Sequence, residues 1–208
     1  GSARTAERHL ATMGLALAPD PAAVPALAAL ARDPQAVVAD SAITGLAGRG
    51  AAAALADLVA DPAATEQHRP AGRALAGLGA TAAPAVLDRL LAADREPRQR
   101  LAQILAALGP EAGPVAAARL DGAPDAALPQ LLWALAALRP AAVAARLTPL
   151  AEHPDPLVRA AVAMVAGRLR DPALLPLMRR LAQDPEPRVA RSASAAATIL
   201  ATLPGDAP

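Results

Sequence analysis

The stretch from Asp155 to Leu181, DPLVRAAVAMVAGRLRDPALLPLMRRL, decides the fold of this chain. The turn in front of it, His153-Pro154-Asp155-Pro156-Leu157-Val158, returns about thirty residues later as Asp184-Pro185-Glu186-Pro187-Arg188-Val189. Between the two turns lie two apolar runs, Val158–Leu169 and Ala173–Leu181. A repeat of this length that is built from two helices predicts an α-solenoid, in which each repeat packs on its neighbours.

Asp-Pro or Pro-Asp pairs recur along the chain at a spacing close to thirty, from Asp33-Pro34 to Asp184-Pro185. Each interval holds a first helix, a break and a second helix, because Gly favours the end of a helix and Pro its first turn. We therefore expect an all-α fold, a right-handed α-solenoid of about six helix pairs plus one C-terminal helix. The expected pairs are 4–18 with 21–32, 35–47 with 51–60, 66–78 with 82–93, 97–108 with 111–121, 125–138 with 140–152, and 156–169 with 172–183, followed by 187–202.

We expect residues 3–204 to form a single solenoid domain. Gly1-Ser2 resembles the scar that protease cleavage of an expression tag leaves, and residues 205–208 are predicted to be a disordered tail. The helix 187–202 carries one apolar stripe and has no second helix after it. Either it folds across the preceding pair and buries that stripe, which we favour, or this edge of the solenoid meets another molecule.

Composition supports many short helices. The chain contains 63 Ala and 32 Leu, which are good helix formers, while 22 Pro exclude a few long helices. Lys, Asn, Phe, Tyr and Cys are absent, a bias that indicates a GC-rich bacterial genome, although a designed protein is the alternative. The net charge of +1 gives no general attraction to nucleic acid or membranes. No uninterrupted apolar run reaches about 18 residues, so no membrane insertion is expected.

The repeat in residues 155–181 resembles the HEAT-repeat superfamily, and weaker copies cover almost all of residues 20–200. The nearest type is the short bacterial HEAT-like repeat that also occurs in the phycobilin-lyase group. The resemblance implies a binding scaffold. It also implies an Arg early in each first helix, close to the acidic residue of a turn, and Arg69, Arg100 and Arg159 match, with Arg191 displaced by one. We interpret these residues as an Asp–Arg ladder between successive turns.

Second helices line the concave face in related solenoids, so their charged side chains are candidates for partner contact. We select Arg119, Arg146, Arg179 and Arg180, of which the last two form the densest basic spot. Ordinary solvation of an exposed face is the alternative. Trp133, the single aromatic residue, falls outside the apolar stripe of its helix. It is therefore expected to be partly exposed, as interface tryptophans often are, unless it fills a gap between small neighbours.

These patterns favour a non-catalytic scaffold that binds a protein or peptide partner on its concave face, as a monomer in the cytoplasm. No cofactor or metal is expected, because His9, His68 and His153 lie in different repeats. Ser192 and Ser194 have no neighbouring His to activate them. The alternatives are a nucleic-acid-binding protein and an enzyme-associated HEAT-like protein of the lyase or DNA glycosylase type. A mixed charge on the candidate face would favour a protein partner, and a uniformly basic face would favour nucleic acid.

Overall fold

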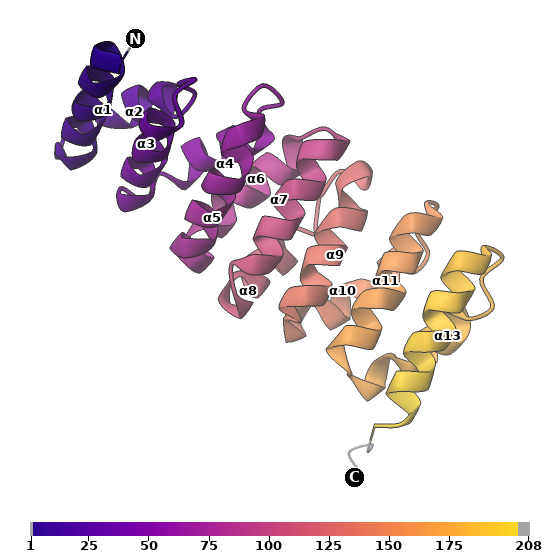
Figure 1. Cartoon of the computed structure of the whole chain (residues 1–208). Helices are drawn as coiled ribbons and strands as arrows, with labels where there is room; N and C mark the ends of the chain where they lie inside the picture. The colour runs from indigo at the N-terminus through magenta and orange to yellow at the C-terminus, as the bar shows by residue number, and fades with distance from the viewer. Residues whose placement is uncertain (1, 204–208) are drawn as a thin grey trace. The chain divides into compact units, whose positions relative to one another are not determined.

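The computed structural model of this chain describes residues 2–203 (Figure 1). Within that range the chain forms α-helices and short 3-10 helices, and no β-strand. It divides into two compact units, Gly1–Ala112 and Gly113–Pro208. The single continuous domain expected over residues 3–204 stays a prediction. Gly1 and the predicted tail, 205–208, lie outside the described residues.

The first unit is a double layer of helices. The first helices α1, α3, α5 and α7 pack side by side in that order, as Figure 1 shows. The second helices α2, α4 and α6 form the other layer, and each packs against the first helix that follows it. The bounds are α1 Ser2–Leu17, α2 Ala23–Leu30, α3 Ala36–Gly48, α4 Ala52–Ala60, α5 His68–Leu78, α6 Ala83–Ala92 and α7 Arg95–Ala107, with 3-10 helices η1 Thr65–Gln67, η2 Gly79–Ala82 and η3 Pro110–Ala112.

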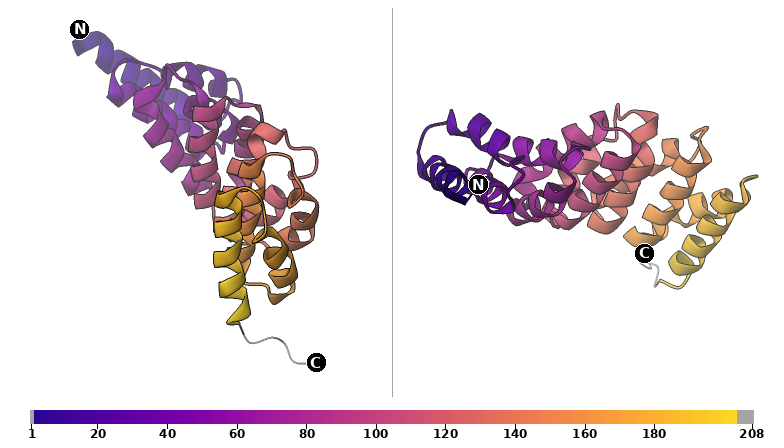
Figure 2. Two further views of the ribbon diagram at one scale, coloured as in Figure 1. Left: turned by 90° about the vertical axis from the view of Figure 1, so that its right-hand side faces the viewer. Right: turned by 45° about the horizontal axis from the view of Figure 1, so that its top comes forward.

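The second unit repeats the same plan. The first helices α9, α11 and α13 lie side by side, and both views in Figure 2 show α13, in yellow, next to α11. The second helices α8, α10 and α12 each pack against the first helix that follows. The bounds are α8 Gly113–Ala118, α9 Leu128–Leu138, α10 Ala144–Leu150, α11 Pro156–Leu169, α12 Leu175–Leu181 and α13 Pro187–Ala201, with 3-10 helices η4 Asp125–Ala127, η5 Ala141–Val143 and η6 Pro172–Leu174.

The predicted order of six helix pairs and a final helix is confirmed for residues 2–203. The same hydrogen bond recurs in the Asp-Pro turns. The Asp carboxylate accepts a hydrogen bond from the backbone N–H two residues later, across a proline that has no N–H of its own, and so fixes the turn in front of the next helix. The bond joins Asp33 to Gln35 (2.8 Å), Asp61 to Ala63 (2.9 Å), Asp171 to Ala173 (2.9 Å) and Asp184 to Glu186 (2.9 Å).

Two of the helix breaks use arginine where glycine is usual. Arg139 follows α9 with φ 49°, and Arg170 follows α11 with φ 57°, both in the left-handed region. The predicted breaks at Arg139-Pro140 and Asp171-Pro172 are therefore confirmed, but the residue that reverses the chain is in each case an exposed Arg. The Arg170 N–H donates to the carbonyl of Ala166, which closes the end of the helix.

The core of each unit is made of Leu, Val and Ala. The predicted stripes are largely buried, including Leu75 of α5, Leu105 of α7, Leu135 of α9 and Val162 of α11. Small residues let the helices approach closely: a Cβ on Gly45 of α3 would lie 2.7 Å from the Cβ of Ala16 in α1. The buried layer is thin, so stability depends on contacts between neighbouring repeats.

The last helix covers its own apolar stripe. Val189, Ala193, Ala196 and Leu200 of α13 are buried, and α13 packs against α11 and α12. This confirms that α13 folds across the preceding pair, because one neighbouring pair suffices to bury a single stripe. The oligomeric state stays a prediction, and Ile199 is the large apolar residue that α13 leaves exposed.

One stretch passes a length and composition test for a membrane span. It is Thr65–Ala92, with a mean hydropathy of 1.3, and it contains η1, α5, η2 and α6. Core helices of soluble proteins pass the same test. Gly79, at φ 60°, separates α5 from α6, and Leu75 and Leu87 are buried inside the unit. In the structure the stretch is two short α-helices, α5 and α6, each with buried residues on one face, and not one continuous helix.

Candidate functional site

The structure places all four selected arginines on or directly after second helices of the second unit. Arg146 of α10 pairs with Asp121, with Nε 3.2 Å from Oδ2. Arg180 of α12 pairs with Glu152, with Nη1 3.3 Å from Oε1. Arg179 is exposed beside Arg180, and Arg119 directly follows α8 and is half-buried. Acids and bases thus alternate along these second helices.

The second helices of the first unit show the same alternation. Arg32, just after α2, places Nε 2.9 Å from Oδ2 of Asp61 at the end of α4. Arg89 of α6 pairs with Asp57 of α4. In both units, bases on or just after second helices therefore pair with acids of a neighbouring repeat: Arg32 and Arg89 in the first unit, and Arg146 and Arg180 in the second.

Trp133 lies on α9 and is 43% exposed. This confirms its predicted partial exposure. The buried leucines Leu131, Leu132 and Leu135 occupy the core side of the helix, and the indole lies outside that set. Its role in partner contact stays a prediction. An exposed indole offers a large rigid apolar surface with one N–H donor, which suits an interface.

Of the arginines predicted for the Asp–Arg ladder, Arg159 pairs with the acid of the next turn as expected, and Arg8, which was not predicted, does the same. Arg159 of α11 binds both carboxylate oxygens of Asp184, at 2.7 and 2.9 Å, and also donates to the carbonyls of His153 and Pro154. Arg8 of α1 binds Asp33 in the same way, with Nε 2.9 Å from Oδ2. Each arginine thus joins its own helix to the turn of the next repeat.

The other predicted ladder residues behave differently. Arg100 of α7 pairs with Glu96 on its own helix at 2.8 Å, and its Nε donates to the carbonyl of Val59 at 3.3 Å. Arg69 of α5 forms no hydrogen bond or ion pair within residues 2–203. The sequence missed Arg8, although Arg8 and Asp33 have the same separation of 25 residues as Arg159 and Asp184.

Three turn carboxylates have lowered pKa values. The hydrogen bond from Arg159 is the largest cause of the lowered pKa of Asp184. For Asp33 and Asp61 the largest cause is the hydrogen bond from the backbone N–H two residues later, at Gln35 and Ala63, and the arginine partner adds to it. The charged carboxylates therefore stabilise the folded chain.

We expect the fold to lose stability as the pH falls below about 4, where these carboxylates become protonated. The folded pKa of each of these carboxyls lies below the ordinary Asp value of 3.8, so their contribution is complete above that pH and is lost as pH falls through the lowered values. Thermal melts between pH 7 and pH 2 should show a steep fall in Tm below about pH 4. The variant Asp184→Asn should show a shallower fall than the wild type. Equal slopes for the two proteins would contradict this assignment.

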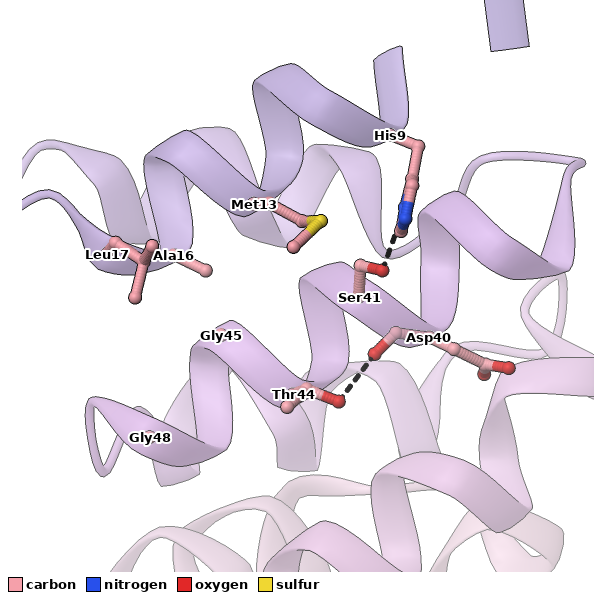
Figure 3. A pocket seen from close by; sticks show the side chains of 9 residues that line it. All are labelled: His9, Met13, Ala16, Leu17, Asp40, Ser41, Thr44, Gly45 and Gly48. Carbon is pink, nitrogen blue, oxygen red and sulfur yellow. Dashed lines mark hydrogen bonds between the residues drawn. The ribbon is translucent and has the colours of Figure 1, made fainter. Parts of the chain in front are cut away.

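A cavity of about 560 Å³ lies between α1 and α3 of the first unit (Figure 3). Met13 and Leu17 of α1 face Ser41, Gly45 and Thr44 of α3 across it. Figure 3 shows the Met13 side chain directed into the space between the helices and the Asp40 carboxylate directed away from α1. Sequence reasoning missed this site. The available signal was Met13 and Leu17, two large apolar residues one helical turn apart on the first helix.

His9 and Ser41 meet at one end of this cavity, with Nδ1 3.0 Å from Oγ. This distance is within the range at which a His can act as the base for a Ser nucleophile. The Ser41 hydroxyl, however, donates its one hydrogen to the carbonyl of Val37 at 2.8 Å. The His9 ring must then donate to Ser41, and in this arrangement it does not accept a proton from it. The pair acts as a bridge between α1 and α3.

Two more grooves adjoin this cavity on the first-helix side of the first unit. A groove of about 390 Å³ between α3 and α5 shares Asp40 and Thr44 with the first cavity. A groove of about 380 Å³ between α5 and α7 shares Arg73 with the second. Neighbouring hollows thus share lining residues and follow one another over α1, α3, α5 and α7, and we call this row of three hollows the first-helix track.

The three histidines lie apart and have other partners. His68 Nε2 lies 2.7 Å from the carbonyl of Asp61, and His153 Nε2 lies 3.4 Å from Asp125. Within the described part of the chain, no group of three or more His, Asp or Glu side chains is placed to hold a metal ion. The structure therefore offers surfaces and grooves as candidate sites.

Comparisons with known proteins identify the repeat in part of the chain. Residues 113–198 match the family model of HEAT repeats. The comparison with curated protein sequences gives no match. Among solved structures the chain is similar to human deoxyhypusine hydroxylase in complex with glycerol, at 21% identity and a TM-score of 0.47 over 93% of this chain and 79% of that one.

Two engineered proteins are also similar. One is an engineered protein at 19% identity, with a TM-score of 0.44 over 94% of this chain and 96% of that one. The other is a designed armadillo repeat protein at 17% identity, with a TM-score of 0.40 over 91% and 98%. The family match assigns HEAT repeats to residues 113–198, which lie in the second unit.

Proposed function

We propose that this chain is a non-catalytic HEAT-like scaffold that binds a protein or peptide partner. The observation that carries the proposal is the set of paired acids and bases on or next to the second helices, which we expect to line the concave face as in related solenoids. Such a surface presents donors and acceptors of both signs, as protein interfaces do. The exposed ring of Trp133 adds an apolar contact beside it.

Nucleic-acid binding is the second candidate, and the same pairs argue against it. Affinity for nucleic acid comes mainly from Lys and Arg that neutralise phosphates. On the second helices, Arg89, Arg146 and Arg180 already face Asp57, Asp121 and Glu152. A phosphate would have to displace a carboxylate at each position, so the face has little net attraction for a polyanion.

An enzyme-associated role of the phycobilin-lyase or glycosylase type is the remaining alternative. A glycosylase needs aromatic side chains to stack an extruded base, and this chain has one Trp. The lyase reading rests on repeat type alone. We further propose a cytoplasmic location and a monomeric state, which cell fractionation and light scattering would check.

The test is charge reversal of Arg179 and Arg180 together. Both side chains are exposed, and the Arg180–Glu152 pair is a surface pair that contributes about 0–1 kcal/mol, so the melting temperature should change little. We expect R179E/R180E to lose the partner that the wild-type chain captures by cross-linking in lysate of its host. The matched control R168E/R170E, on α11 and directly after it, should retain the partner.

Two outcomes would count against the scaffold proposal. Capture that survives R179E/R180E would remove these residues from the site. Nuclease-sensitive capture, or retention of a fluorescent 20-mer duplex at physiological salt, would favour the nucleic-acid alternative, because such binding weakens steeply as salt rises.

A further inference from the structure

The first-helix track has chemically different ends. At the α1–α3 end, Met13 is 46% and Leu17 is 84% exposed, next to the small residues Ala16, Gly45 and Gly48. At the α5–α7 end, Arg69, Arg73 and Arg100 converge from two helices beside Gln103. Asp40 lies between the two ends and lines the first two hollows. The track thus runs from apolar, through acidic, to basic.

The charged groups of the track are available to a ligand. Arg69 and Arg73, one turn apart on α5, form no hydrogen bond or ion pair within residues 2–203, and neither does the Asp40 carboxylate. Arg100 holds Glu96 with one nitrogen, so the α5–α7 groove keeps an excess of positive charge. Unpaired guanidinium groups on two adjacent helices suit a carboxylate, which each can bind through two nitrogens.

We propose that the first-helix track binds an extended peptide that carries an apolar side chain, then a basic one, then an acidic one. The apolar side chain enters the α1–α3 cavity, the base meets Asp40, and the acid meets Arg69 and Arg73. This proposal rests on the proposed scaffold function and deepens it, since it names a partner class and a second surface.

Spacing sets the pattern of that peptide. Packed helices lie about 8–10 Å apart, so neighbouring hollows of the track are separated by about that distance. An extended chain advances about 3.3 Å per residue, so each step spans about three residues. The bound segment therefore has its apolar, basic and acidic residues at about i, i+3 and i+6, which span about seven residues, and a nine-residue peptide contains this pattern with a residue to spare at each end.

Gly48 provides a way to block the apolar end without damage to the fold. A Cβ at Gly48 would meet nothing within 4 Å, whereas a Cβ at Gly45 would collide with Ala16. Gly48 is the last residue of α3 and lines the cavity. The variant Gly48→Leu therefore fills the mouth of the cavity and leaves the contact between α1 and α3 intact.

The experiment is selection from a phage-displayed library of random nine-residue peptides on the purified full chain. Enriched peptides should carry a large apolar residue and an Asp or Glu about six positions away, with Lys or Arg between them. Fluorescence polarisation with one labelled enriched peptide should show at least a tenfold loss of affinity for R69E/R73E and for Gly48→Leu. Circular dichroism melts should show that both variants remain folded.

Controls separate this proposal from the scaffold function. R168E/R170E, with the same charge change in the second unit, should bind the peptide like the wild type. Peptides lost on R179E/R180E but kept by R69E/R73E would overturn the track and retain the proposed function. Failure to enrich any peptide would overturn the track as a peptide site, and enrichment without an acidic residue would do the same.

Discussion

Replacing Leu75 by alanine is expected to lower the free energy of unfolding by about 3 kcal/mol, because the change removes fully buried apolar atoms and leaves a cavity. Leu75 lies in α5, which packs against α3, α4 and α7. The first unit contains no Phe, Tyr or Trp that could move into the space. Urea unfolding followed by circular dichroism measures the loss, and Tm should fall by roughly 6–12 °C.

Leu10→Ala is the matched control for this prediction. Leu10 lies in α1 of the same unit, with the same side chain exposed to solvent and outside the cavity between α1 and α3. Its replacement should change the free energy of unfolding by less than about 0.5 kcal/mol. A loss as large as that of Leu75→Ala would mean that the apolar face of α1 is covered in solution, which would contradict the exposure of Leu10 in the structure.

Replacing Arg159 by alanine is expected to have a similarly large effect, about 3 kcal/mol, because it leaves the Asp184 carboxylate buried without its charged partner. The Arg159 side chain is 15% exposed and that of Asp184 is 6% exposed. Four hydrogen bonds are lost together: two to Asp184 and one each to the carbonyls of His153 and Pro154. These bonds connect two successive turns, so α13 should separate from α11 more readily.

A double-mutant cycle distinguishes this pair from general surface effects. Asp184→Ala should cost a similar amount, since it also removes the acceptor of the Glu186 N–H. The double variant should lose less than the sum of the two single losses, by about 1–3 kcal/mol. Arg188→Ala, an exposed arginine at the start of α13, should be close to neutral. Additive losses for Arg159 and Asp184 would contradict a direct interaction.

The structure shows two different surfaces where a partner could bind. The arginines that stand out in the sequence, Arg146 and Arg180, are engaged by acids of neighbouring repeats. Arg69, which the sequence predicts to pair with an acid of a turn, has no partner within residues 2–203 and lines the groove between α5 and α7. Two surfaces therefore merit separate variants, and the peptide selection decides between them.

The helices and their order follow from local sequence signals. Alternation of Asp-Pro turns with Ala- and Leu-rich runs predicts every helix pair over residues 2–203, and α11 begins and ends at the predicted residues, Pro156 and Leu169. These signals are local, because an Asp carboxylate caps the N–H two residues later and Pro cannot continue a helix. The apolar spacing likewise predicts the buried residues, since the core side of a helix follows from its period.

The pairing of charges and the position of the hollows depend instead on contacts between repeats. Arg8 meets Asp33 while Arg69 meets no partner, although both lie on first helices, because the outcome depends on which turn or side chain the next repeat brings within reach. The cavity beside Met13 likewise depends on the close approach of Ala16 to Gly45, a contact between two helices that are separated in sequence by another. Such contacts depend on packing distances between repeats, which a helical period within one segment does not encode.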